Sequence, residues 1–267
     1  MKADLHVHSN HSDGTKTIQE LIEIAKEKEI DILSITDHDT INGFLEYQTL
    51  NSDYPLIAGI ELSTYRNKSP IHILGYFYDN NIESKELIEY LEIMKEKRNI
   101  RIQKIITKLK EYFELEVDYE DVKKGSHGVI ARPHIARVIS EKYGYEYREV
   151  FDKFLNDDSP AYVEIERLDT KDAIDMLHRN NAIAVLAHPL YLKNNDINDI
   201  IKLGIDGIEV YYEEQDEEYY HQLAIENNLL ITGGSDYHGD LNTSELGSKT
   251  LNDKELKLFL NKLNKGE

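Results

Sequence analysis

Residues 4–14 read DLHVHSNHSDG, and this short stretch indicates the architecture of the whole chain. His6 and His8 alternate with apolar residues, as in a β-strand, so both imidazoles point to the same face. A turn follows at Asp13-Gly14, in which we expect Gly14 to take a positive φ. Two histidines and the Asp13 carboxylate at one strand end suit Zn, Fe or Mn. The alternative is a strand with unrelated histidines before a polar turn.

Composition narrows the classes of protein to which the chain can belong. Its 267 residues suffice for one large domain, or for a domain with an insertion. The absence of cysteine excludes disulfides, cysteine-bound zinc and a cysteine nucleophile. A formal net charge of −20 opposes binding to long nucleic acids. We find no signal segment or membrane-spanning stretch, so we expect a cytoplasmic protein without a membrane partner. No feature indicates an oligomeric state.

Strand and helix patterns alternate on both sides of a helical middle region. We predict about seven strands, most of them separated by helices, as in parallel βαβ units. This pattern predicts an α/β barrel formed by residues 1–80 and 166–267. Apolar residues recur at helical spacing through the charged stretch between these parts, which predicts a mostly helical insertion at 81–165.

Residues typical of metal ligands occur at the predicted strand ends. They are His6, His8, His38, Glu61, His72, His188, Asp236 and His238. Because the carboxyl ends of barrel strands meet at one face, we expect these side chains to form one site. Taken singly, Glu61 could be a solvated carboxylate and His72 a core histidine. Four histidines fall outside the pattern and are expected to be surface or structural residues, namely His11, His127, His178 and His221.

Six blocks in this order resemble the PHP (polymerase and histidinol phosphatase) superfamily of metal-dependent phosphoesterases. The blocks are DLHVHSNHSDG, TDHDT, GIEL, IHILGYF with its His72, LAHP and GGSDYHG, and they span nearly the whole chain. The resemblance implies a distorted (β/α)7 TIM-like barrel that holds a cluster of divalent Mn, Fe or Zn ions. Family members hold two or three such ions, and we expect three here. No ligand position is substituted, which argues against a metal-free scaffold.

The resemblance also assigns the ligands of each ion. The first ion is assigned to His6, His8, Glu61 and Asp236. Glu61 bridges to the second ion, which also takes His72 and His188. The third ion is assigned to Asp13, His38 and His238.

A motif in the helical region narrows the resemblance. Residues 131–137 read ARPHIAR, with Pro133 in the first turn of a helix. Arg132 and His134 then lie beside free helix-start N–H groups, which can bind an anion. The motif resembles phosphatases that act on nucleoside 3′,5′-bisphosphates, some of which also trim short RNA from the 5′ end. By this resemblance, Arg132 and His134 contact the substrate phosphate and act in catalysis.

Two further arginines are candidates for contact with a second phosphate. Arg98 and Arg101 lie on the long predicted helix, where a solvated helix face is an equally simple interpretation. Leu190-Tyr191-Leu192 follows the LAHP block where a basic residue would be expected, which leaves the exact substrate open.

We therefore expect hydrolysis of a phosphate monoester of a small phosphorylated nucleotide, or of a short oligonucleotide. Hydroxide formed from a water that bridges two ions is the expected nucleophile. Arg132 matches phosphate geometry, and His134 is a candidate proton donor. The alternatives are a histidinol-phosphate phosphatase, a 5′-3′ exonuclease on short RNA and a non-catalytic metal-binding module.

Overall fold

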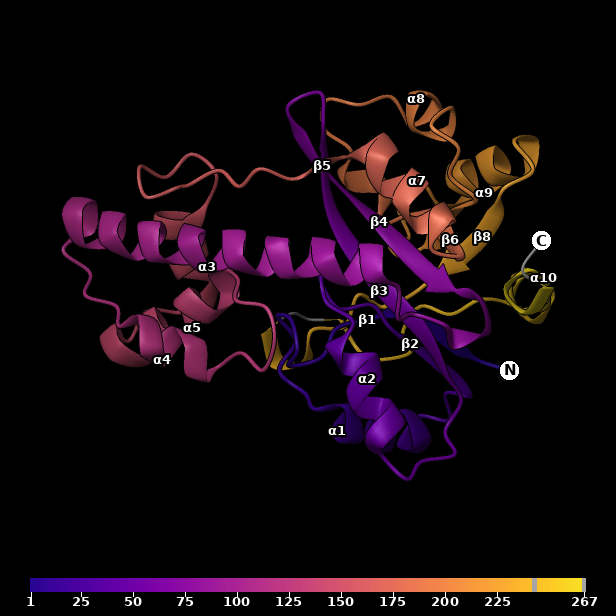
Figure 1. The fold of residues 1–267 in the computed structure, drawn as a ribbon, viewed down its shortest axis with the longest axis horizontal. Coiled ribbons are helices and arrows are strands. Elements are labelled where there is room, and N and C mark those ends of the chain that lie inside the picture. The colour runs from indigo at the N-terminus through magenta and orange to yellow at the C-terminus, as the bar shows by residue number, and fades with distance from the viewer. Residues whose placement is uncertain (242–243, 266–267) are drawn as a thin grey trace.

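The computed structural model describes residues 1–241 and 244–265 and has a barrel-shaped sheet that is nearly closed (Figure 1). The sheet path consists of β1 (Ala3–Val7), β2 (Ile32–Ile35), β3 (Leu56–Arg66), β4 (Ser69–Phe77), β6 (Ala182–Leu186), β7 (Gly207–Tyr211) and β8 (Leu230–Gly233). The short β5 (Leu168–Asp169) pairs with β3. A bridge between Val7 and Tyr237 links β1 to the segment after β8. The predicted α/β barrel is therefore confirmed.

Helices surround the sheet and form the middle region of the chain (Figure 1). Those between or after the barrel strands are α1 (Ile18–Glu27), α2 (Asn42–Thr49), α7 (Thr170–Arg179), α8 (Ile197–Ile201), α9 (Glu217–Glu226) and α10 (Asp253–Lys265). Those of the middle region are α3 (Lys85–Phe113), α4 (Tyr119–Lys124), α5 (Arg132–Tyr143), α6 (Tyr147–Val150) and the π-helix η2 (Phe151–Leu155). Short 3-10 turns are η1 (Tyr78–Asn80), η3 (Pro189–Tyr191) and η4 (Gly239–Leu241).

Strand β4 departs from the parallel arrangement that the sequence predicts. It pairs antiparallel with both β3 and β6. Only Asn67 and Lys68 separate β3 from β4, and both have a positive φ, as a two-residue hairpin turn requires. Such a short connection leaves no room for a crossover helix. His72 consequently lies near the start of its strand, opposite Ser63, at the same mouth of the barrel as the ends of the parallel strands.

Gly14 is required for a different reason from the one expected. The glycines that have a positive φ in the described residues are Gly144, Gly204, Gly239 and Gly247, so the predicted left-handed backbone at Gly14 is wrong. A Cβ atom at position 14 would instead lie 2.4 Å from the carbonyl oxygen of His8 and 2.9 Å from that of Ser9. The glycine therefore allows the turn to fold tightly back against the end of β1.

The hydrophobic core of the middle region is separate from the cores around the barrel. Leu87 and Leu91, in the first turns of α3, pack with the barrel residues. Ile102, Ile105 and Leu109, further along the same helix, pack instead with α4, α5 and η2. Helix α3 thus joins the two packed regions and holds the middle region beside the barrel (Figure 1).

Among the described residues, no helix combines the length and the apolar character needed to cross a membrane.

Candidate metal centre

Nine side chains that the sequence indicates as ligands converge at one mouth of the barrel. They come from β1 and the turn after it, from the β3–β4 hairpin, and from the segments after β2, β6 and β8. Each has a ligand atom within 3.8 Å of a ligand atom of another member. The nine are His6, His8, Asp13, His38, Glu61, His72, His188, Asp236 and His238.

Glu61 lies at the centre of this group. Five imidazole nitrogens lie within 3.4 Å of its carboxylate oxygens, namely those of His6, His8, His38, His72 and His188. His72 and His188 approach Oε1 at 2.9 and 3.0 Å, whereas the other three approach Oε2 at 3.0 to 3.4 Å. One carboxylate therefore joins two sets of imidazoles, as a bridging ligand does.

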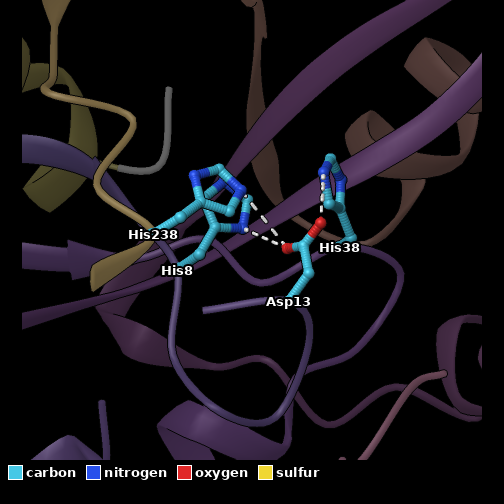
Figure 2. Close-up of side chains that lie close together, drawn as sticks. All are labelled: His8, Asp13, His38 and His238. Carbon is cyan, nitrogen blue, oxygen red and sulfur yellow. Dashed lines mark ion pairs between the residues drawn. The ribbon is translucent and has the colours of Figure 1, made fainter. Parts of the chain in front are cut away.

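A second carboxylate, Asp13, lies on the other side of His8. Figure 2 shows Asp13 directed between His8 and His238 on one side and His38 on the other. Its Oδ1 is 3.3 Å from Nε2 of His238 and 3.7 Å from Nδ1 of His8. Its Oδ2 is 3.8 Å from Nε2 of His38. The two nitrogens of His8 thus face different carboxylates, because its Nε2 lies 3.1 Å from Oδ1 of Asp236.

The donor atoms fit a shared cation better than they fit one another. Oε2 of Glu61, Nδ1 of His38 and Oδ1 of Asp13 are buried and form no hydrogen bond among the described residues. Nevertheless, the first two atoms are 3.0 Å apart. Three overlapping subsets have all their ligand atoms within 4.8 Å of one another, and they are His8/Asp13/His38/His238, His6/His8/Glu61/Asp236 and His38/Glu61/His72. Imidazole and carboxylate donors of this kind suit Mn, Fe and Zn.

Charges within the site stabilise one another. Burial opposes the charged form of His8, but the carboxylates of Asp236 and Glu61, 3.1 and 3.2 Å from its Nε2, outweigh it and raise the His8 pKa to about 10. Burial also acts against the charged form of Glu61, yet the positive charges of His38, His72 and His6 hold its pKa well below the usual range. Burial lowers the His72 pKa to about 4, so protons on imidazoles such as that of His8, and not on His72, balance the carboxylates; a divalent cation can replace those protons.

Two buried carboxylates that the sequence analysis missed hold the ligands in place. Glu209, on β7, lies 2.9 Å from Nδ1 of His6 and accepts the backbone N–H of His188 at 2.7 Å. Asp37 accepts hydrogen bonds of 2.6 to 2.7 Å from Ser9 and Ser12, in the turn that carries Asp13. The sequence contained a signal for Glu209, which is the single carboxylate in the apolar strand Gly207–Tyr211. A buried carboxylate requires a polar partner, so its position indicates a role beside other polar groups.

Of the two residues from the ARPHIAR motif, His134 lies next to the metal ligands. It is 5% exposed and lines a cavity together with Asp13 and Gly14. Burial lowers the His134 pKa, although the charge of Asp13 opposes this shift. Its Nδ1 accepts the backbone N–H of Ala131 at 3.0 Å, so the neutral ring carries its proton on Nε2. The Nε2–H of the neutral His134 ring is therefore a hydrogen-bond donor beside Asp13.

The three arginines that the sequence indicates for phosphate contact already have partners within the protein. Arg132 donates to the carbonyl of Leu155 and to Asp157, at 2.7 and 2.8 Å. Arg98 forms a buried ion pair with Asp39, the residue after His38. Arg101 donates from Nε to the carbonyl of Val163 at 2.7 Å.

A cavity of about 300 Å³ opens over the metal ligands. Glu61, His72 and His188 contribute to its floor, and Tyr191 and Tyr212 contribute to its wall. The two tyrosine rings meet edge to face, with their centroids 5.7 Å apart. The cavity therefore combines a charged floor with an aromatic wall.

Comparisons with known proteins agree with this geometry. The family model described as "PHP domain" matches residues 4–167. The chain is 29% identical to phosphoribosyl 1,2-cyclic phosphate 1,2-diphosphodiesterase of Eggerthella lenta, over 90% of this chain and 95% of that protein. It is 32% identical to the 5′-3′ exoribonuclease Rnm of Escherichia coli, over 92% of this chain and 88% of that protein.

A further relative and a solved structure extend the comparison. The chain is 28% identical to 3′,5′-nucleoside bisphosphate phosphatase of Chromobacterium violaceum, over 88% of this chain and 86% of that protein. A crystal structure from Bifidobacterium adolescentis, described as a metal-dependent phosphoesterase, superposes with a TM-score of 0.87 at 25% identity, covering 97% of this chain and 95% of that one. The barrel, the converging ligands and these similarities together show that the chain belongs to the PHP domain family and is a metal-dependent phosphoesterase.

Proposed function

We propose that the protein hydrolyses a phosphate monoester of a small phosphorylated nucleotide, such as the 3′-phosphate of a nucleoside 3′,5′-bisphosphate. The observation that carries this proposal is the position of Glu61, which joins two sets of imidazoles at the floor of the cavity. Two cations held by these sets would neutralise the charge on the oxygens of a phosphate ester.

These donor groups would hold three ions in the arrangement that the family resemblance implies. His6, His8, Glu61 and Asp236 would hold the first ion. Glu61, His72 and His188 would hold the second, and Asp13, His38 and His238 the third. Ions bound there supply Lewis-acid charge and lower the pKa of a coordinated water toward neutrality.

Residues of the insertion complete the proposed phosphate site. Nε2–H of His134 is directed by the hydrogen bond at its Nδ1 and would donate to an oxygen of the phosphate. Arg132 lies two residues away at the start of α5, and its guanidinium, held in place by the carbonyl of Leu155 and by Asp157, offers further N–H groups to an anion. The proposed hydrolysis needs no covalent enzyme intermediate, because the nucleophile is derived from water.

The aromatic wall of the cavity favours a nucleotide over a sugar phosphate. Tyr191 is 51% exposed, and its ring lies 5.7 Å from that of His188. An exposed aromatic ring beside the reaction site offers a surface on which a base stacks, worth about 1–3 kcal/mol per base. Lys193 lines the same cavity. It supplies a positive charge directly after Leu190-Tyr191-Leu192, where a basic residue was expected from the resemblance.

Release of inorganic phosphate from a small panel of substrates tests this function. We expect Mn²⁺-loaded protein to cleave 3′-phosphoadenosine 5′-phosphate faster than histidinol phosphate, and to lose this activity in excess chelator. Asp13→Asn protein should keep its fold but lose most of its turnover. Faster phosphate release from histidinol phosphate would instead indicate a histidinol-phosphate phosphatase. Activity in protein that is verified to be free of metal would reject the proposal.

Trimming of short 5′-phosphorylated RNA is the second candidate, because the Escherichia coli relative bears that name and is 32% identical. The net charge of −20 disfavours long strands but leaves room for a short 5′ end in the cavity. A ladder of shortened products from a labelled RNA pentamer would support this activity, whereas uncleaved RNA beside rapid cleavage of the bisphosphate would exclude it.

A further inference from the structure

A short segment of the middle region lies against the turn that follows β1. It is the connection between α4 and α5, residues 126–130, which extends from the middle region toward the barrel (Figure 1). The backbone N–H groups of His127 and Val129 donate hydrogen bonds to the carbonyl oxygens of Asn10 and His11, at 3.1 and 2.8 Å. The middle region therefore contacts the backbone of the turn that carries one of the proposed metal ligands.

Gly128 makes this close contact possible. A Cβ atom at position 128 would lie 2.3 Å from the carbonyl oxygen of His11 and 3.1 Å from its carbonyl carbon. Gly128 does not have a positive φ, so the short distance to the turn, rather than an unusual backbone angle, requires a glycine here. Because the obstructing atoms belong to the backbone, a side chain at this position would push the connection and the turn apart.

Both partners of this contact are anchored in packed parts of the protein. Ile130, at the end of the connection, is buried in the hydrophobic core of the middle region together with Ile135 of α5. In the turn, Nε2 of His11 lies 2.6 Å from the carboxylate of Glu46, which is on α2. His11 is thus held through its backbone by the middle region and through its side chain by a helix of the barrel.

Asp13 depends on this turn for its position more than the other two proposed ligands of the third ion do. Its carboxylate faces imidazole nitrogens 3.3 to 3.8 Å away, and its Oδ1 forms no hydrogen bond within the described residues. By contrast, a backbone bridge joins His38 to Glu61, and Nδ1 of His238 lies 2.8 Å from the carbonyl oxygen of Asp236. A displacement of the turn would therefore move Asp13 away from ligands that stay in place.

We infer that Gly128 and Glu46 are positioning residues for the third proposed ion, because together they fix His11 and thereby Asp13. Asp37 holds the serines of the same turn from the barrel side. Loss of either contact to His11 loosens the other side of the turn and weakens binding of the third ion, while the ligands of the first two ions are unaffected. This inference rests on the three-ion arrangement of the proposed function and makes the third site dependent on the middle region.

Gly128→Ala tests the contact with the middle region. Equilibrium dialysis of metal-free protein against Mn²⁺, with bound manganese counted by mass spectrometry, measures the metal affinities without reference to activity. We expect the wild-type protein to bind three ions. In the variant, the third dissociation constant should rise by about 10- to 100-fold, as for other changes next to metal ligands, with the first two unchanged. In crystals grown at limiting Mn²⁺, the anomalous peak beside Asp13 should fall while those beside Glu61 persist.

Gly125→Ala is the matched control. A Cβ atom at position 125 would lie 2.5 Å from Nη2 of Arg137, which is the end of a flexible side chain and can move aside. Gly125 also has an ordinary helical backbone, with a φ of −86°, so alanine introduces no strain. The same substitution should here leave all manganese affinities at wild-type values. A loss of the third ion equal to that of Gly128→Ala would overturn the inference.

Glu46→Ala loosens the turn without adding an atom, so it tests the inference even if Gly128→Ala does not fold. It removes the contact of 2.6 Å that holds the His11 side chain to α2. We expect the third dissociation constant to rise by about threefold to tenfold, which corresponds to the loss of one hydrogen bond. A wild-type affinity for the third ion in every variant that folds would overturn the inference.

Kinetics separate a positioning role from a merely structural one. With 3′-phosphoadenosine 5′-phosphate as substrate, Gly128→Ala should be slow at limiting Mn²⁺ and should regain most of the wild-type kcat at saturating Mn²⁺, with KM unchanged. A general loss of structure would instead lower the unfolding temperature of the metal-free protein and the rate at every Mn²⁺ concentration, without a selective loss of the third ion. That result would also overturn the inference.

The count of bound ions also separates this inference from the proposed reaction. A third ion whose affinity depends on Gly128, without release of phosphate from any substrate, would uphold the inference and reject the reaction. Phosphate release beside a third ion whose affinity is the same in all variants would do the reverse. Wild-type protein that binds only two ions would reject the third site and the inference with it.

Discussion

At the scale of single residues, the site depends on side chains that act through their neighbours as well as on the ligands themselves. His188 and Asp236 have positive φ angles of 28° and 49°, and residues other than glycine rarely adopt such backbone conformations. The backbone N–H of His188 is held by Glu209 at 2.7 Å, and this hydrogen bond keeps the residue in that conformation. Such conformations persist where surrounding contacts impose them, often at functional sites.

Glu209→Gln tests this positioning role. The amide keeps the shape of the side chain but removes the charge that faces Nδ1 of His6. We expect metal affinity or activity to fall by about 10- to 100-fold with the fold retained, because carboxylates that orient ligating histidines have effects of this size. Metal content by mass spectrometry and initial rates across a Mn²⁺ titration provide the measurement.

Glu255→Gln is the control for that variant. Glu255 is also buried and lies 3.0 Å from a histidine, His221, but neither residue belongs to the metal centre. This variant should bind metal as the wild-type protein does. Equal metal affinity in both variants would show that Glu209 has no positioning role.

At the scale of secondary-structure elements, the sequence predicted the order and type of most segments. Thr17 and Glu20 form the expected capping box at the start of α1, because these contacts are local in the chain. The direction of β4 was missed, since an apolar run such as residues 71–77 looks the same in a parallel and an antiparallel strand. The pairing of Asn67 and Lys68 in a tight turn, rather than the run itself, sets that direction.

The attachment of α3 to the barrel gives a prediction at this scale. Arg98 is 6% exposed and pairs with the buried Asp39, which also accepts the backbone N–H of Ser63 at 2.9 Å. Arg98→Met would leave the Asp39 charge without its partner and should lower the free energy of unfolding by about 3–5 kcal/mol. Urea denaturation measures the loss. The control is Arg148→Met, because Arg148 is exposed on α6. A decrease no larger than that of this control would show that the ion pair does not hold α3.

The end of α7 provides a pH-dependent prediction away from the metal centre. His178 lies 2.7 Å from Asp206, and this hydrogen bond raises the His178 pKa above its ordinary value of 6.5. Since the folded protein binds this proton more tightly than the unfolded chain, the contribution to stability is complete below pH 6.5 and disappears as the pH rises through the folded pKa.

Compared with His178→Gln, the wild-type protein should therefore be more stable at pH 6 and no more stable at pH 9. The partly exposed pair limits the difference at pH 6 to about 1 kcal/mol or less. Urea unfolding of both proteins at the two pH values gives the comparison. A difference that is the same at both values would exclude the charged His178 as its source.

At the scale of the whole molecule, ligands that are more than 200 residues apart in the chain meet in one site. His6 and Asp236 lie 3.3 Å apart, because the segment after β8 closes onto β1 through the bridge between Val7 and Tyr237. The positions of the ligands after successive strands predicted this convergence. The environment of Arg167, whose buried Nε forms no hydrogen bond within the described residues, could not be predicted, since it depends on how the segment before β5 packs against α3.

The distribution of charge also appears only at this scale. The chain carries a net charge of −20, yet Arg98, Arg132 and Arg167 lie close enough to Arg101 to lower its pKa, and Arg98 pairs with Asp39, next to His38. An acidic chain with a local concentration of positively charged side chains favours small anionic substrates over long polyanions. A formal charge computed from composition cannot reveal such a local reversal.

Anomalous X-ray diffraction from crystals of the Mn²⁺-loaded protein addresses the proposed metal cluster directly. We expect manganese peaks within coordination distance of both oxygens of Glu61, with a further peak beside Asp13 and His238. These peaks should disappear from crystals of a Glu61→Gln variant or lose most of their height. Wild-type crystals with no manganese peak near Glu61, or with peaks only at other surfaces of the protein, would contradict the assignment of this mouth of the barrel as the catalytic centre.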